Sequence, residues 1–426
     1  MIPKNKQLLN NDYILSLFNK IYSILIGIVS SAFYIRYLGI QYKGTYSYIN
    51  EITTIIGLVI NMGIYQSYPF FFREKGHGIF TDYVNTFVQQ FLIYFGISAG
   101  IVVFSFNRDY IVLFVAIQVP FLVFKTQLDN IILVEQLKLY MWVDMGLKTI
   151  LALIYFLLWL FAPVHISYVV FTVSITNLFV CIIYLYSTKY KFSLACLKPN
   201  VAFIKEVVRF GFFPMLSALL ITLNYSVDII FLQNMGSAVE LSIYSVAAVL
   251  INYVWIIPNA FKDVLISKVA RTSSQNEVAF SCRISLFITL VCLIGFFIIG
   301  RPVITIIFGA DFEKCYSVTL ILFIGAFSMI FFKMLGVVFV TEGKQLEYFM
   351  ILLISVIVNV IANYLFIPIW GMYGAAFASV TSYTLCGIAF LLKYCKWKKE
   401  KVSNYIKPQK KDIVPVIKIL YLRRNR

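Results

Sequence analysis

Long apolar runs, separated by short polar breaks, follow one another along the whole chain. A helix rises ~1.5 Å per residue, so a run of ~20 apolar residues can cross a hydrocarbon layer of ~30 Å. Reading the apolar windows between the breaks predicts twelve membrane-spanning helices. Their approximate ranges are 13–35, 45–68, 80–105, 110–134, 143–162, 165–187, 210–233, 241–261, 284–300, 317–340, 347–368 and 373–394.

Composition agrees with a polytopic membrane protein. Hydrophobic residues make up 61% of the chain and charged residues 13%, whereas an ordinary soluble domain carries about 25% charged residues. The seven cysteines lack a C-x-x-C pair, so neither a disulfide framework nor a zinc site is predicted. His77 and His165 lie too far apart in the predicted topology to share a metal, and no metal site is expected. The first apolar run leads into Arg36 rather than a small-residue cleavage site, so it is expected to stay in the mature protein.

The distribution of Lys and Arg predicts the orientation in the membrane. The N-terminus, the even-numbered loops and the C-terminal tail hold 28 of the 36 basic residues, and the odd-numbered loops hold 5; Lys148 and Lys393, near the approximate span ends, are counted with the adjoining loop and tail. Basic residues collect on the cytoplasmic side of membrane proteins, so both termini are predicted to be cytoplasmic. The net charge of +17 is then mainly topological, and nucleic acid is not an expected partner.

The longest predicted cytoplasmic connection, 188–209, contains five basic residues and divides the spans into two sets of six. The chain is therefore expected to be an all-α integral membrane protein of two six-helix bundles. Its expected parts are an N-terminal bundle at 1–187, a linker at 188–209, a C-terminal bundle at 210–394 and a basic tail at 395–426.

The three remaining basic residues, Lys20, Lys125 and Lys333, are assigned to predicted spans. A charged side chain at the centre of a membrane helix costs ~2.5–3.5 kcal/mol, so such residues tend to face a bundle interior or a water-filled cavity. These lysines predict a cationic cavity suited to a diphosphate or another anionic headgroup. Two alternatives stay open: Lys125 could pair with Asp129 at i,i+4, and Lys20 and Lys333 could extend to the cytoplasmic surface.

Other polar residues extend this predicted cavity. Glu51 and Asp228 lie in the outer halves of their spans, although Asp228 could equally cap a helix or face lipid headgroups. Amides in a bilayer either contact a polar solute or hold helices together by hydrogen bonds, and the second role is commoner. The candidate cavity amides are Asn19, Asn61, Asn224, Asn252 and Asn359.

Enzymatic activity is not expected. The chain has no GxxxxGK[ST] segment, so it does not bind nucleotide through a P-loop. The longest predicted external loop, about 301–316, is too short for the carboxylates or histidines that a membrane-bound polysaccharide polymerase or transferase needs. Such an enzyme is the less favoured alternative to a transporter.

Several stretches, taken in order, resemble one family of transporters. The resemblance begins at 19–73 and continues at spans 7, 8, 10 and 12, covering almost the whole chain. The matching residues are Ile35-Arg36-Tyr37-Leu38-Gly39, Gly44-Thr45-Tyr46-Ser47, Asn61-Met62-Gly63-Ile64, Phe210-Gly211-Phe212-Phe213-Pro214, Asp228, Ile243-Tyr244-Ser245, Phe308-Gly309, Ile367-Pro368, Gly371 and Gly374-Ala375-Ala376. They resemble the polysaccharide-transport branch of the multidrug/oligosaccharidyl-lipid/polysaccharide (MOP) exporter superfamily.

The resemblance implies two six-helix bundles around a central cavity and a Wzx-like role as an O-antigen or capsule flippase. Such a protein moves undecaprenyl-diphosphate-linked oligosaccharide across the bacterial cytoplasmic (inner) membrane by alternating access. Its implied partners are this lipid-linked oligosaccharide, membrane lipid, a polysaccharide polymerase and chain-length proteins. The lysines would hold the diphosphate. No cofactor is expected, and a proton or sodium gradient would act through Asp228, Glu51 or Asp129.

The main alternative within the same superfamily is a cation-coupled multidrug exporter. The fold alone does not separate the two functions. A cationic cavity favours an anionic, lipid-linked cargo, whereas an exporter of organic cations should present carboxylates at the same place.

Overall fold

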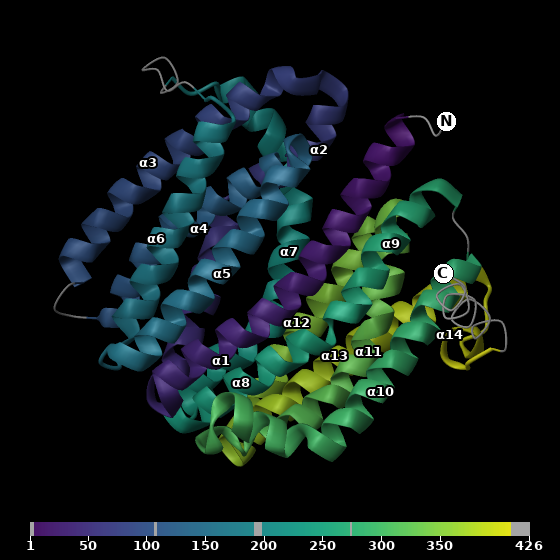
Figure 1. Cartoon of the computed structure of the whole chain (residues 1–426). Coiled ribbons are helices and arrows are strands. Elements are labelled where there is room, and N and C mark those ends of the chain that lie inside the picture. The colour runs from purple at the N-terminus through teal and green to yellow at the C-terminus, as the bar shows by residue number, and fades with distance from the viewer. Residues whose placement is uncertain (1–3, 106–108, 191–197, 273–274, 410–426) are drawn as a thin grey trace. The chain divides into compact units, whose positions relative to one another are not determined.

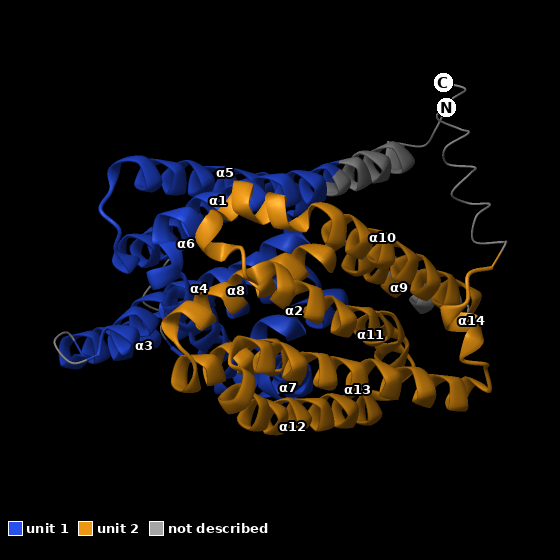
Figure 2. Ribbon diagram, turned by 90° about the horizontal axis from the view of Figure 1, so that it is seen from below, with its two compact units in different colours: residues 1–222 blue, residues 223–426 orange. Residues whose placement is uncertain are grey.

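The computed structural model describes residues 4–105, 109–190, 198–272 and 275–409, and the regular elements in these ranges are all helices (Figure 1). The chain divides into two compact units, Met1–Thr222 and Leu223–Arg426 (Figure 2). The expected all-α membrane fold is confirmed.

Unit 1 is built around α4, which packs against α1, α2, α3, α5 and α6. The helix α1 is in fact two helices joined at Gly39, whose φ of 60° lies in the region that favours glycine. A later helix, α7, starts in this unit. The bounds are α1 Lys4–Ile60, α2 Ile64–Lys75, η1 Gly76–Ile79, α3 Phe80–Ser105, α4 Tyr110–Glu135, α5 Leu137–Phe161, α6 Ile166–Ser187 and α7 Val201–Met235.

Unit 2 is built around α11, which packs against α8, α9, α10, α12 and α13. The end of α7 completes this unit. The bounds are α8 Ala238–Val254, α9 Ile256–Thr272, α10 Gln275–Phe308, η3 Ala310–Phe312, α11 Cys315–Thr341, α12 Gln345–Trp370, α13 Met372–Lys398 and α14 Ser403–Ile406.

The described residues contain 10 helical stretches long and apolar enough to cross a membrane, and the shorter apolar helix α8 adds to them. With the two helices of α1 counted separately, these stretches correspond to the twelve predicted spans. Two predicted spans are interrupted. The span at 45–68 breaks at 61–63, and the span at 241–261 is divided at Trp255. The second break precedes Pro258, which has no backbone N–H and is tolerated in the first turn of a new helix.

The break at 61–63 has a structural cause in the approach of α7. Met62 and Gly63 have φ of 53° and 71°, which ends the helical path of α1. A Cβ atom at position 63 would lie 2.2 Å from the Gly211 carbonyl oxygen, and one at position 211 would lie 2.1 Å from the Gly63 oxygen. Glycine at both positions therefore lets the main chain of α7 contact the main chain of the break.

The division between the units falls inside α7, after Thr222, and thus beyond the expected linker at 188–209. The first part of α7 packs within unit 1, where Phe210 stacks on Phe70 with ring centroids 4.3 Å apart. Residues 191–197 of the expected linker lie outside the described residues.

The expected tail at 395–426 begins inside α13, which ends at Lys398. Its next residues pack on unit 2: Tyr405 is buried, and the Arg283 guanidinium donates to the Asn404 carbonyl oxygen. Residues 410–426 lie outside the described residues.

Candidate functional site

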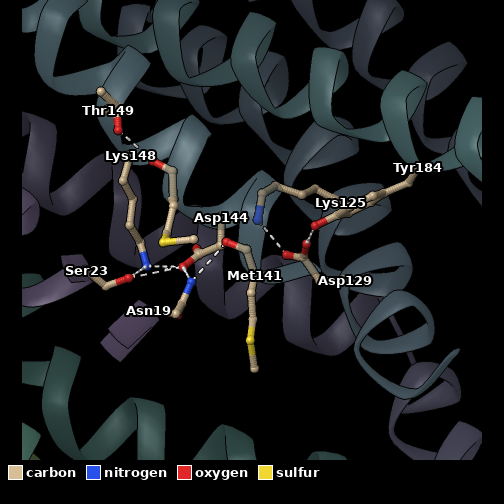
Figure 3. A network of polar contacts seen from close by, with 10 residues as sticks. Asn19, Ser23, Lys125, Asp129, Met141, Asp144, Lys148, Thr149 and Tyr184 are labelled. Atoms are coloured by element: carbon tan, nitrogen blue, oxygen red, sulfur yellow. Dashed lines mark hydrogen bonds and ion pairs between the residues drawn. The ribbon is translucent and has the colours of Figure 1, made fainter. Parts of the chain in front are cut away.

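Lys125 and Asp129 form an ion pair one helical turn apart on α4 (Figure 3). The Lys125 Nζ lies 2.5 Å from Asp129 Oδ2, and the Tyr184 hydroxyl donates to Asp129 Oδ1 at 3.0 Å. Each side chain of the pair is 20% exposed. The charge of Lys125 is thus balanced within its own helix, as the i,i+4 alternative describes.

A second ion pair lies within α5 and is hydrogen-bonded to α1 (Figure 3). The Lys148 Nζ lies 2.6 Å from Asp144 Oδ2, and the same oxygen accepts from Ser23 Oγ at 3.2 Å. Asn19 Nδ2 donates to the Met141 carbonyl at 3.0 Å and to Asp144 at 3.4 Å, so this predicted cavity amide holds two helices together. The next residue, Lys20, has an exposed side chain.

Sequence reasoning missed this pair, because Lys148 had been assigned to the adjoining cytoplasmic loop. The available signal was the i,i+4 spacing of Asp144 and Lys148, which is the same spacing that marked Lys125 and Asp129. Opposite charges one turn apart inside an apolar run indicate a pair that neutralises itself.

The break at 61–63 borders a small cavity in unit 1 that is lined by apolar as well as polar side chains. Asn61 is buried, and its Oδ1 accepts from Gln127 Nε2 at 3.1 Å. The same Gln127 nitrogen donates to Gln90 Oε1 at 2.6 Å. The cavity beside Asn61 has a volume of about 110 Å³ and is lined by Thr54, Gly57, Leu58, Asn61, Tyr65, Leu122, Val123 and Thr126.

Elsewhere in unit 1, Lys43 is a buried cation that sequence reasoning had assigned to a loop. Its Nζ donates to Ser47 Oγ and lies 5.8 Å from the ring centroid of Tyr34. The predicted coupling residue Glu51 is half-buried and acts electrostatically on Lys43.

Unit 2 holds a buried carboxylate that is bound by neutral groups. Asp228 has no exposed surface. Its Oδ1 accepts from Asn363 Nδ2 at 2.7 Å, and its Oδ2 accepts from the Tyr244 hydroxyl at 2.5 Å and from Ser379 Oγ. No Lys or Arg in the described ranges forms a salt bridge with this carboxylate.

Two of the predicted amides belong to the same network. Asn359 Nδ2 donates to the Asn224 carbonyl at 2.9 Å, and Asn224 Nδ2 donates to Ser355 Oγ at 3.0 Å. The contacts join α7, α8, α12 and α13, whereas the predicted Asn252 is exposed on α8. We call this cluster the Asp228 network; its members, each at most 2% exposed, are Asn224, Asp228, Tyr244, Ser355, Asn359, Asn363, Ser379 and Ser382.

Lys333 occupies a different environment in unit 2. Its side chain is buried, with the residue only 9% exposed, and its Nζ donates to Asn259 Oδ1 at 3.1 Å. The ammonium lies 4.5 Å from the ring centroid of Trp255 and 5.7 Å from that of Tyr225. No Asp or Glu within the described part of the chain forms a salt bridge with it, so Lys333 is a buried cation with neutral partners. Sequence reasoning found Lys333 but not Trp255 or Asn259, because these residues lie more than 70 positions away in the chain.

Comparisons with known proteins agree with this architecture. The family model described as "Polysaccharide biosynthesis protein" matches residues 98–317. The capsular polysaccharide biosynthesis protein CapF of Staphylococcus aureus is 23% identical over 269 residues, which cover 61% of this chain and 68% of CapF. The lipid II flippase MurJ in an inward closed conformation shares the fold, with a TM-score of 0.68 and 13% identity over 97% of this chain and 92% of MurJ. An inward-facing multidrug resistance MATE family transporter of the MOP superfamily also shares it, with a TM-score of 0.63 and 12% identity over 89% of this chain and 95% of the transporter.

Proposed function

Because the chain belongs to the polysaccharide biosynthesis protein family and has the fold of MOP superfamily transporters, we propose that it is a flippase for undecaprenyl-diphosphate-linked oligosaccharide. The cargo would be an O-antigen or capsule repeat unit, carried across the bacterial cytoplasmic membrane by alternating access. The observation that carries this proposal is Lys333, a buried cation with neutral partners inside a membrane-spanning helix.

The sign of this charge favours an anionic cargo. Burying an unpaired ammonium in a membrane protein is costly, and an anionic ligand recovers part of that cost when it binds. Lys20, which is exposed, is a second candidate for contact with the diphosphate. Lys125 is a weaker candidate, since Asp129 already neutralises it. In the proposed orientation both termini are cytoplasmic, in line with the excess of basic residues in the tail and even-numbered loops.

Coupling to a proton or sodium gradient is proposed to act through Asp228. A buried carboxylate bound only by hydroxyl and amide donors can accept a proton or contribute oxygen ligands to a sodium ion. Asn224 and Asn359 would then support the site rather than contact the oligosaccharide. Asp129 is a weaker candidate for coupling, since it already forms an ion pair with Lys125. Glu51 remains a candidate in unit 1.

The test is surface polysaccharide in a flippase-deficient bacterial strain, normalised to the amount of protein in the membrane. Lys333→Ala should lower surface polysaccharide about tenfold, which is the effect of losing ~1.4 kcal/mol of binding. Lys333→Arg should restore more activity than Lys333→Gln, because it restores the charge. The matched control is the double variant Lys125→Ala with Asp129→Asn, which removes a balanced pair and should stay near wild type. Wild-type activity from Lys333→Ala would remove the observation on which the proposal rests.

A cation-coupled multidrug exporter is the second candidate, and the buried carboxylate of Asp228 favours it. Resistance of cells to organic cations, measured with wild type and Asp228→Asn, separates the two functions. Resistance that depends on Asp228, together with failure to restore surface polysaccharide, would favour the exporter. Glycan extension by the purified protein would instead favour a polymerase or transferase.

A further inference from the structure

Two hydrogen-bond donors beside Lys333 are buried without a partner. Trp255 Nε1 and the Tyr225 hydroxyl each have no hydrogen-bond partner among the described residues. The rings of Tyr225 and Trp255 are 4.9 Å apart between centroids, and Tyr383 lies 5.8 Å from both. We call this cluster the Lys333 box; its members are Tyr225, Trp255, Asn259, Lys333 and Tyr383. Burying an unpaired polar group is unfavourable, so two such groups around one cation need an explanation.

The unpaired groups share one chemical character. The indole N–H of Trp255 can only donate, and the ammonium of Lys333 has three donors, of which Asn259 Oδ1 takes one. The Tyr225 hydroxyl is free to donate as well. Lys262, three residues beyond Asn259 on α9, is a second basic residue on the helix that supplies Asn259. Such a set of donors and cations matches an oxyanion, whereas a cationic ligand would be repelled.

The box lies wholly within unit 2 and draws on separate elements. Tyr225 comes from α7, Trp255 from the junction of α8 and α9, and Lys333 from α11. The helices α8 and α9 pack against α11, and Trp255 is only 4% exposed. An oxyanion bound here would therefore be largely removed from water, where its hydrogen bonds to the ammonium and the indole are strongest.

We propose that the Lys333 box is an oxyanion-binding site in which Lys333 Nζ, Trp255 Nε1 and the Tyr225 hydroxyl donate to one phosphate or carboxylate group. This inference deepens the proposed function and rests on it only for the source of the oxyanion. That source is either the diphosphate of the lipid carrier or an acidic sugar of the oligosaccharide. Both present the same acceptor oxygens to the box.

A structural role for the aromatic rings makes the opposite prediction about the two donors. If Trp255 and Tyr225 served only as a cation–π platform for Lys333, their N–H and O–H groups would be superfluous. Tyr225→Phe would then keep the ring and remove only a buried unpaired hydroxyl, which is neutral or stabilising. Trp255→Phe would keep an aromatic face but would also lose buried ring volume. If the donors bind an oxyanion, the same substitutions weaken binding.

The experiment is isothermal titration of the purified full-length protein in detergent with pyrophosphate and, separately, with glucuronate. Trp255→Phe and Tyr225→Phe should each weaken binding of the preferred probe about tenfold, and Lys333→Gln should abolish it, because hydrogen bonds to a charged group are strong. The matched control is Trp397→Phe. Trp397 also lies under two lysines, 4.3 Å from Lys398 and 5.3 Å from Lys344, but those lysines have carboxylate partners in Glu342 and Glu347.

The outcomes separate the possible readings. Binding of pyrophosphate alone identifies the carrier diphosphate as the source, and binding of glucuronate alone identifies an acidic sugar. No binding of either probe by wild type, or equal affinity in the wild type and both Phe variants, overturns the site. Thermal unfolding of each variant verifies that it is folded. If Lys333→Gln does not fold, the two Phe variants still decide the test. Oxyanion binding by a protein that fails to restore surface polysaccharide would leave the site intact and overturn the flippase proposal instead.

Discussion

Two ion pairs of unit 1 contrast with two separated charges of unit 2. In unit 1, Lys125 with Asp129 and Lys148 with Asp144 form ion pairs one turn apart within a helix. In unit 2, the cation Lys333 has no carboxylate partner and the anion Asp228 has no cationic partner among the described residues. A paired charge is neutralised by its partner within the unit, whereas a separated charge can still attract a ligand or an ion. This difference is the reason we propose that Lys333 and Asp228, both in unit 2, carry the ligand and ion chemistry.

Exposure strengthens this contrast. The ion pairs of unit 1 lie in partly exposed positions, with side-chain exposures of 20% for Lys125 and 35% for Lys148. Water screens such pairs, and each contributes little to stability. Lys333 and Asp228 are almost or wholly buried, so every contact they make or lack carries a larger free energy. Substitutions of Lys333 and Asp228 should therefore have larger effects than substitutions within these two ion pairs.

The largest expected effect is that of Asp228→Ala. This change removes an acceptor from Asn363, Tyr244 and Ser379, which keep only their contacts with Asn359 or with each other. Each buried donor left unpaired costs about 1–3 kcal/mol. We expect the free energy of unfolding to fall by about 3 kcal/mol or more, measured as a lower thermal midpoint in detergent. Asp228→Asn keeps an acceptor oxygen and should lose clearly less. Identical midpoints for wild type and Asp228→Ala would show that the network does not stabilise unit 2.

A smaller effect is expected when unit 2 is made to resemble unit 1. Asn259→Asp places a carboxylate at the position that now contacts Lys333 Nζ at 3.1 Å. The new ion pair should neutralise Lys333 and reduce transport about tenfold, equivalent to ~1.4 kcal/mol, without loss of folded protein. Surface polysaccharide per membrane protein is the measurement. Asn252→Asp, at an exposed site on α8, is the control for adding a negative charge. Unchanged transport by Asn259→Asp would mean that the free charge of Lys333 is not needed.

The smallest effect is expected within unit 1. A double-mutant cycle on Asp144→Ala and Lys148→Ala should give a coupling energy of about 0.5–1 kcal/mol, because the pair is partly exposed. Asp144→Ala alone should cost more than Lys148→Ala alone, since Asn19 and Ser23 also lose an acceptor. Thermal unfolding supplies both quantities. Single-variant losses of equal size would indicate that Asn19 and Ser23 do not contribute through Asp144.

The sequence was informative where the chemistry is local. Apolar run lengths predicted the spans, and the spacing of Lys125 and Asp129 offered the pairing that the structure shows. The break at 61–63 was not predictable, because Met62 and Gly63 take left-handed conformations next to Gly211, about 150 residues away. The Lys333 box was hidden for the same reason. In a helix that is apolar on all sides, the sequence pattern does not show which residues face which neighbouring helix. The contact between Trp255 and Lys333 depends on tertiary packing and could not be predicted from that pattern.

The contact between Gly63 and Gly211 brings the main chain of α7 directly against the main chain of the break at 61–63. This part of α7 lies in unit 1, and the part from Leu223 to Met235 belongs to unit 2. A methyl group at either glycine would clash with the main-chain carbonyl of the other, and no flexible side chain could move to relieve that clash. Both glycines belong to unit 1, so the clash would fall within that unit, on the part of α7 that precedes Pro214. The break at 61–63 is therefore a position of unit 1 where even alanine is too large.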